Sequence, residues 1–112
     1  MAVRMDKPWI PLTAENVAKL TAHLGVYQLA DAQGEIVYIG VAGGRTLFGL
    51  KGELQRVLQA PPAGAAQFRF EANMAYRTRH EELLAVFLSD NEKLPKANSD
   101  LDPRTLGRIR PG

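Results

Sequence analysis

The stretch GVYQLADAQGEIVYIGV, residues 25–41, decides the fold because it has the pattern of two β-strands joined by a turn. Residues 25–30 and 35–41 are rich in apolar, β-branched and aromatic side chains, which favour strands. The four residues between them, Asp-Ala-Gln-Gly at 31–34, are of the types that form turns. We therefore expect an antiparallel hairpin, in which Tyr27 and Tyr38 share a face if the strand register allows it.

Helical patterns lie on both sides of this hairpin. Thr13 is a good capping residue and precedes apolar residues at helical spacing, which predicts a helix over residues 14–23. Leucine and valine recur at helical spacing over residues 47–58, where we expect a second helix that the prolines at 61 and 62 end. A third helix is expected to begin at Asn73, as its cap, and to end near residue 90.

A third strand and the order of elements complete the prediction of the fold. Residues 67–71 alternate polar residues with phenylalanine, which predicts a short half-buried strand. The chain therefore reads as an α/β fold of the α+β kind, with a small three-stranded antiparallel sheet flanked by helices. At 112 residues we expect one domain over 25–98, with residues 1–24 packed on it and a basic extended tail at 99–112.

Composition excludes several classes of protein. The chain has no cysteine, which rules out a disulfide scaffold, thiolate zinc sites and a cysteine nucleophile. No apolar run approaches the roughly 20 residues of a membrane span, and residues 1–7 lack the apolar core of a secretory signal. We therefore expect a cytoplasmic protein with no membrane partner. Fourteen basic and twelve acidic residues give a net charge of only +2, so the overall charge is weak evidence for an anionic partner.

Two strings in the hairpin carry a family resemblance. Gly25-Val26-Tyr27 and Val37-Tyr38-Ile39-Gly40 together resemble the signature of the GIY-YIG nuclease superfamily, and the resemblance covers roughly residues 25–98. It implies a β-β-α-β-α core, here with one extra helix in front. It also implies an endonuclease that hydrolyses phosphodiester bonds in DNA with one divalent ion, Mg²⁺ or Mn²⁺.

The resemblance further implies roles for particular residues. Tyr27 and Tyr38 take the two tyrosine positions, where a tyrosine deprotonates or orients the attacking water, next to Gly40 in the substrate site. Such a base requires a lowered pKa, since the ordinary value is near 10. An arginine would stabilise charge on the phosphate, and a glutamate on the later helix would hold the ion.

The chain departs from the family pattern at the cationic positions. Val41 stands where a lysine commonly follows the glycine, and Phe48 stands where the arginine is expected. The candidates for the arginine's role are Arg45, Lys51 and Arg56. We favour Lys51, although lysine lacks the bidentate geometry of arginine, and an ordinary surface role stays open for all three.

The metal ligand and the substrate contacts are also displaced. Asn98 resembles the asparagine of the family's Pro-x-x-Asn ending and is a candidate substrate contact, but twelve residues before it the chain has Val86, which cannot bind a cation. Glu82 is the expected metal ligand, with Glu81 as the alternative. Arg77 and Arg79 are candidate phosphate contacts, and a solvated helix start is the other interpretation.

These departures motivate a second hypothesis of a different class. The chain would then be a degenerate GIY-YIG-type module that binds nucleic acid or a protein partner without cleavage. The chain has no room for a separate DNA-targeting domain, so specificity would require a dimer, a partner subunit or a structure-selective substrate. The tail at 99–112, with Arg104, Arg108 and Arg110, is the candidate for that contact.

Overall fold

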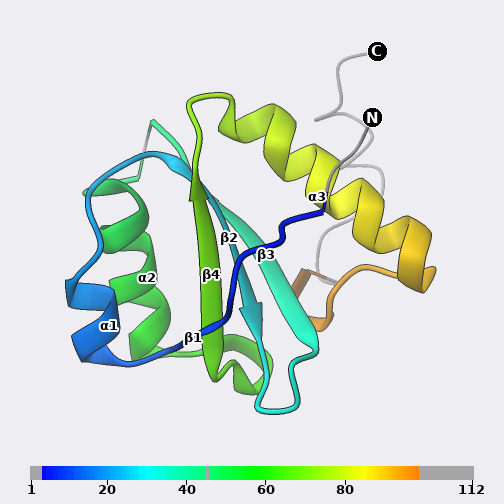
Figure 1. Cartoon of the computed structure of the whole chain (residues 1–112), viewed down its shortest axis with the longest axis horizontal. Coiled ribbons are helices and arrows are strands. Elements are labelled where there is room, and N and C mark those ends of the chain that lie inside the picture. Colours follow the sequence, from blue (N-terminus) through cyan, green and yellow to red (C-terminus); the bar gives the residue numbers. More distant parts are fainter. Residues whose placement is uncertain (1–3, 45, 99–112) are drawn as a thin grey trace.

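A four-stranded antiparallel sheet forms the centre of the fold (Figure 1). The computed structural model describes residues 4–44 and 46–98, so that the predicted tail at 99–112 lies outside the described residues. The strands lie in the order β1-β4-β2-β3. They are β1 (Ile10–Pro11), β2 (Gly25–Ala30), β3 (Ile36–Ala42) and β4 (Gln67–Ala72).

The predicted hairpin is confirmed as β2 and β3. Its register determines whether Tyr27 and Tyr38 share a face of the sheet. Tyr27 lies opposite Gly40, and Leu29 lies opposite Tyr38. Because alternate residues of a strand share a face, Tyr27 and Tyr38 lie on the same face of the sheet. The turn forms as its residue types indicate, since Oδ1 of Asp31 accepts hydrogen bonds from the backbone N–H groups of residues 33 and 35.

The sheet has one strand more than the sequence predicts. In β1, Ile10 pairs with Phe68 and Pro11 pairs with Gln67. The strand is only two residues long and contains a proline. Proline cannot donate a backbone hydrogen bond, so it is tolerated at a sheet edge, where one side of the strand has no partner. Two residues give no periodic signal, so the sequence alone does not indicate this strand.

The three predicted helices are present with adjusted ends. Thr13 caps α1 (Ala14–Ala18) through a 3.1 Å hydrogen bond from the backbone N–H of Asn16 to its Oγ1. The helix is shorter than predicted, because the carbonyls of His23 and Leu24 accept backbone hydrogen bonds from Leu50 and Asn73, which hold the following segment extended. The second helix, α2 (Gly49–Gln59), ends before Pro61 as expected.

The prediction that Asn73 caps the third helix is wrong. The N-cap of α3 (Tyr76–Asn91) is Ala75, and no side chain caps this helix. Oδ1 of Asn73 instead accepts a 2.8 Å hydrogen bond from the backbone N–H of Ala75, so that Asn73 stabilises the turn before the helix. No helix of the described residues is long and apolar enough to cross a membrane.

Two apolar clusters, one on each face of the sheet, hold the helices in place. The first contains Tyr27, Leu29 and Phe68 of the sheet together with residues of α1 and α2. The second contains Val26 and Ile39 of the sheet together with residues of α3. The sheet therefore separates α1 and α2 from α3.

Candidate functional site

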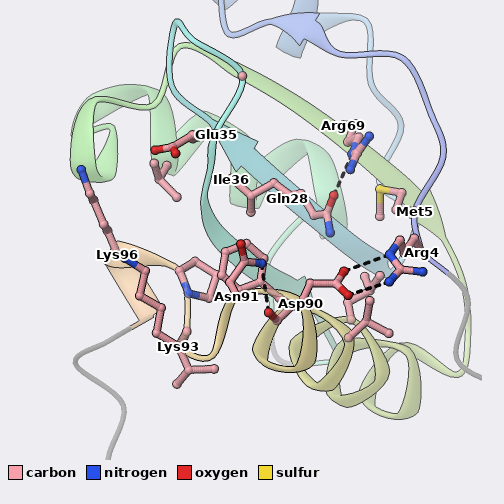
Figure 2. Close-up of a pocket in the computed structure, with 17 residues that line it drawn as sticks. Arg4, Met5, Gln28, Glu35, Ile36, Arg69, Asp90, Asn91, Lys93 and Lys96 are labelled. Carbon is pink, nitrogen blue, oxygen red and sulfur yellow. Dashed lines mark hydrogen bonds and ion pairs between the residues drawn. The ribbon is translucent and has the colours of Figure 1, made fainter.

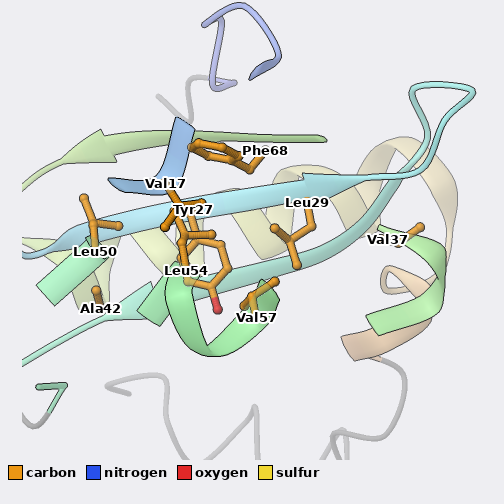
Figure 3. Packing of buried hydrophobic residues seen from close by; sticks show 9 residues of the cluster. All are labelled: Val17, Tyr27, Leu29, Val37, Ala42, Leu50, Leu54, Val57 and Phe68. Atoms are coloured by element: carbon orange, nitrogen blue, oxygen red, sulfur yellow. The ribbon is translucent and has the colours of Figure 1, made fainter. Parts of the chain in front are cut away.

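Tyr27 and Tyr38 lie side by side on the face of the sheet that packs against α1 and α2. Their ring centres are 5.9 Å apart, and the ring planes are tilted by 44°. Tyr27 is fully buried, with its ring beside Leu54 and Val57 (Figure 3), whereas Tyr38 on the edge strand is half-buried. Strand pairing therefore brings the two predicted site tyrosines together.

Gly40 makes room for these rings. A Cβ atom at this position would lie 2.5 Å from Oη of Tyr27 and 2.6 Å from Cε2 of Tyr38. Both distances are far inside normal contact, so only glycine lets the buried Tyr27 ring lie across the neighbouring strand. Packing is sufficient to explain the glycine of the second string.

A carboxylate that the sequence analysis did not single out lies at the tyrosine pair. Oη of Tyr27 donates a 3.2 Å hydrogen bond to Oε1 of Glu53 on α2, and Arg56 forms an ion pair with the same carboxylate oxygen. The Glu53 side chain is 12% exposed, and these two partners supply the polar contacts that a largely buried carboxylate requires. The sequence signal for this cluster is the i, i+3 spacing of Glu53 and Arg56 on one helix.

The electrostatics of this cluster hold both tyrosines in their neutral form. Burial is the largest effect that raises the pKa of Tyr27, and the neighbouring Tyr38 and Glu53 raise it further. Burial and Glu53 also raise the pKa of Tyr38, against a smaller lowering by Arg56. A tyrosine base requires a shift in the opposite direction.

The cationic candidates are distributed along and before α2. Lys51 lies half-buried in the first turn of the helix, and Arg56 lies further along with its guanidinium paired to Glu53. Arg45 lies outside the described residues. Arg56, which lies beside the tyrosine pair through Glu53, is thus neutralised by a carboxylate.

Glu82 lies across the sheet from the tyrosines. It is on α3, where its carboxylate forms an ion pair with Arg79, and Arg79 also binds Glu71 of β4 at 3.1 Å. The Arg79 side chain is only 10% exposed. Glu71 is opposite Val26 of β2 and shares its face, which is the face that α3 covers.

We tested whether this arrangement fits the divalent ion that the family resemblance implies. An ion at Glu82 would compete with the buried guanidinium of Arg79 and would lie on the other side of the sheet from Tyr27. Within residues 4–44 and 46–98, no group of three or more histidine, aspartate or glutamate side chains is placed to hold a metal ion. The described residues therefore do not fit a metal shared by Glu82 and the tyrosine pair.

The side chain of Asn98 bonds to the backbone of β3. Its side chain is buried, and it donates a 3.1 Å hydrogen bond to the carbonyl of Ile39 while accepting a 2.8 Å hydrogen bond from the N–H of the same residue. Nε2 of His80 on α3 lies 3.1 Å from the same carbonyl. Asn98 thus occupies the outer edge of β3, and both polar atoms of its buried amide bond to the backbone of that strand.

Arg77 and Arg79 are separated by the turn of their helix. Arg77 is exposed in the first turn of α3, whereas Arg79 is held between its two carboxylates. Of the two, only Arg77 therefore presents its charge to solvent. Two positions that depart from the family pattern also differ in exposure. Phe48 is exposed, whereas Val41 packs against the apolar cluster under α3.

The fold and this site define a small α+β domain whose sheet carries a pair of tyrosines on one face, one buried and one half-buried. The model of a family described as Domain of unknown function (DUF7508) matches residues 3–90, which is most of the chain, and the chain therefore belongs to that family. No curated protein and no solved structure matches the chain. The family match gives no link to the GIY-YIG nucleases, so that resemblance enters only as part of a proposal.

Proposed function

We propose that this domain is a GIY-YIG-type module that binds nucleic acid without cleaving it. The single observation that carries the proposal is the chemistry of one end of the sheet, where exposed apolar side chains lie beside cations and two helix N-termini. The order β2, β3, α2, β4, α3 agrees with the β-β-α-β-α core that the sequence resemblance implies. This end of the sheet is called the loop end below, and it comprises residues 43–51 and 73–77 except residue 45.

The pairing of the strands brings these two segments to the same end. Gly25 is opposite Ala42 of β3 and also opposite Ala72 of β4, so both strands leave the sheet at this point (Figure 1). The backbone N–H of Gly44 donates a 3.1 Å hydrogen bond to Oη of Tyr76, which joins the two segments directly.

Three large apolar side chains are exposed at the loop end. Leu47 is 75% exposed, Phe48 is 64% exposed and Met74 is 79% exposed. An exposed aromatic ring can stack on a nucleic-acid base whatever the sequence, and this contact is the usual basis of single-strand binding. Phe48 therefore supplies a stacking surface, and Leu47 and Met74 are exposed apolar side chains of the same loop end.

The charges at the loop end favour an anion. Lys51 and Arg77 lie in the first turns of α2 and α3, and neither helix has an acidic residue in its first turn or a side chain that caps it. Helix N-termini without acidic residues favour phosphate through the helix dipole. The nearby carboxylates of Glu53 and Glu71 are neutralised by ion pairs.

Two features of the predicted catalytic residues argue against cleavage. The pKa values of both tyrosines are raised, and Glu82 lies across the sheet in an ion pair. Neither arrangement favours the metal-assisted hydrolysis that the resemblance implies. Nuclease activity is accordingly the alternative that the experiments must exclude.

Binding is tested by fluorescence anisotropy with labelled single-stranded and duplex oligonucleotides over a range of salt. We expect tighter binding to the single strand, and a loss of at least about fivefold in affinity on Phe48→Ala, because stacking contributes about 1–3 kcal/mol per base. Lys51→Ala and Arg77→Ala should each reduce the salt dependence by about 0.7 in the log–log slope.

Two substitutions away from the loop end serve as controls. Leu88→Ala removes an exposed apolar side chain of α3, and Lys19→Ala removes an exposed lysine that follows α1. Neither should change affinity. Equal losses in the controls, or no binding to any oligonucleotide by the folded protein, would overturn the proposal.

Cleavage is tested on single-stranded, duplex, flapped and branched DNA with Mg²⁺ or Mn²⁺. We expect no cutting by the wild-type protein. Metal-dependent cutting that disappears in Tyr38→Phe and Glu82→Ala would instead establish a nuclease with these residues in its site.

A further inference from the structure

A pocket of about 350 Å³ lies on the opposite face of the sheet from the tyrosine pair, and no step of the proposed function uses it (Figure 2). It is enclosed by the second half of α3, the end of the hairpin, the segment at Arg4 and Met5, and residues 93–96. A water molecule takes up about 30 Å³ in the liquid, so the pocket has room for about 12 non-hydrogen atoms. This size suits a small organic ligand.

A buried amide opens into this pocket. Gln28 is the one amide side chain on β2, and it is 4% exposed. Its Oε1 accepts a 2.7 Å hydrogen bond from Nε of Arg69, while its Nε2 donates to no partner among the described residues and is not sealed away from solvent. Figure 2 shows this nitrogen directed into the pocket. A donor that opens into a pocket and has no partner among the described residues can bond to a ligand that brings an acceptor oxygen.

The polar contacts of Gln28 are held rigidly. The guanidinium of Arg69 lies 4.2 Å from the centre of the Trp9 ring and donates a 3.1 Å hydrogen bond to the carbonyl of Lys7. With Arg69 fixed in this way, Oε1 of Gln28 is fixed as the acceptor and Nε2 faces the pocket. The orientation of the amide is therefore set before any ligand binds.

The walls supply an apolar surface and a positive charge. Ile36, Val86 and Phe87 supply an apolar part of the lining, beside a polar part of similar extent. Four cationic side chains and two carboxylates also line it, and one pair of these, Arg4 and Asp90, is joined by hydrogen bonds of 2.6 and 2.9 Å. In Figure 2, Lys93 lies on the other side of Gln28 from Arg4. It makes no ion pair with a described residue.

We propose that this pocket binds a small organic acid, with its apolar body against Val86 and Phe87 and an oxygen that accepts a hydrogen bond from Nε2 of Gln28. The surplus of cations at the rim selects an anion over a neutral or cationic molecule of the same shape. The site is independent of the loop end and of nucleic-acid binding.

The test is a titration of the ¹⁵N-labelled full chain, followed by amide chemical shifts, with three sets of molecules matched in shape. The acids are benzoate, hexanoate and indole-3-acetate, and each has its carboxamide and its amine counterpart. We expect at least one acid to shift the side-chain NH₂ of Gln28 and the backbone amides of Ile36 and Phe87. Its affinity should exceed that of the matching amine at least about tenfold.

Variants separate the pocket from other surfaces. Val86→Trp fills the space and should abolish these shifts, while Lys93→Ala should weaken the acid about threefold and leave the carboxamide unchanged. Lys19→Ala, an exposed lysine outside the pocket, should change neither and is the matched control. If Val86→Trp does not fold, the Lys93→Ala comparison alone decides the result.

Three outcomes would overturn the proposal. The first is that no acid shifts the pocket residues at millimolar concentration. The second is that the acid and the amine bind equally. The third is that the shifts survive the filling of the pocket in a folded Val86→Trp protein.

Discussion

Gly40→Ala tests whether the glycine between the two tyrosines is a requirement of packing. The added methyl group would lie 2.5 Å from Oη of Tyr27 and 2.6 Å from Cε2 of Tyr38. Carbon atoms in contact are normally about 3.5–4.0 Å apart, so the overlap is about 1 Å. Tyr27 is fully buried and is hydrogen-bonded to Glu53, so its ring cannot move aside without breaking other contacts.

The expected cost follows from this geometry. Overpacking a well-filled core costs about 1–3 kcal/mol, and Gly40→Ala should lie at the upper end because two rings are affected. We therefore expect a loss of about 3 kcal/mol in the free energy of unfolding, out of a total that is roughly 5–15 kcal/mol for natural domains. The measurement is urea unfolding followed by far-UV circular dichroism.

A double-mutant cycle identifies the cause of the loss. Tyr27→Leu removes the ring atoms nearest to the new methyl group, so Gly40→Ala should cost about 1–2 kcal/mol less in that background. Gly44→Ala is the control, because its methyl group would meet only Oη of Tyr76 at 3.4 Å. If the costs of the two substitutions simply add, or if Gly40→Ala is neutral, the packing explanation is refuted.

Three further predictions concern the partners of α3 and β3. Asn98→Ala should lower the free energy of unfolding by about 2–3 kcal/mol in denaturant titrations, because it leaves the N–H of Ile39 buried without a partner, whereas a role in substrate binding alone predicts unchanged stability. Arg79→Met should cost about 2 kcal/mol by the same measurement, because it leaves Glu71 without its cation, and a cost near zero would show that this ion pair is not stabilising. Burial lowers the pKa of His80. The stability that neutral His80 contributes is therefore complete above about pH 6.5 and is lost as the pH falls through the folded-state pKa. In thermal melts between pH 7 and 5, the melting temperature of the wild type should fall more steeply with falling pH than that of His80→Gln.

The hairpin was predictable from sequence because each of its signals is local. The turn depends on Asp31 and Gly34, and the strands depend on β-branched and aromatic residues within a few positions of one another. The end of α1 was not predictable, because it is set by hydrogen bonds that the carbonyls of His23 and Leu24 accept from residues more than twenty positions away in sequence. The two-residue strand β1 has no periodicity to detect.

The candidate site was predictable only in part for the same reason. Tyr27 and Tyr38 could be named from their strings, but their shared face depends on the register of two strands. The position of Glu82 depends on which face of the sheet α3 covers, which sequence spacing does not determine. Glu53 and Gln28 can be recognised as site residues only when the side chains that they bond to, Tyr27 and Arg69, are known.

The contacts of Asn98 with Ile39 also affect how copies of this protein meet. β3 is the outermost strand of the sheet on its side, and a strand in that position offers its N–H and C=O groups to any extended chain that comes alongside. Near the middle of β3, the side-chain amide of Asn98 already fills both groups of one residue, and His80 adds a second contact. An incoming strand would have to displace both side chains, so this edge is protected against fibril-like growth at the cost of one buried amide.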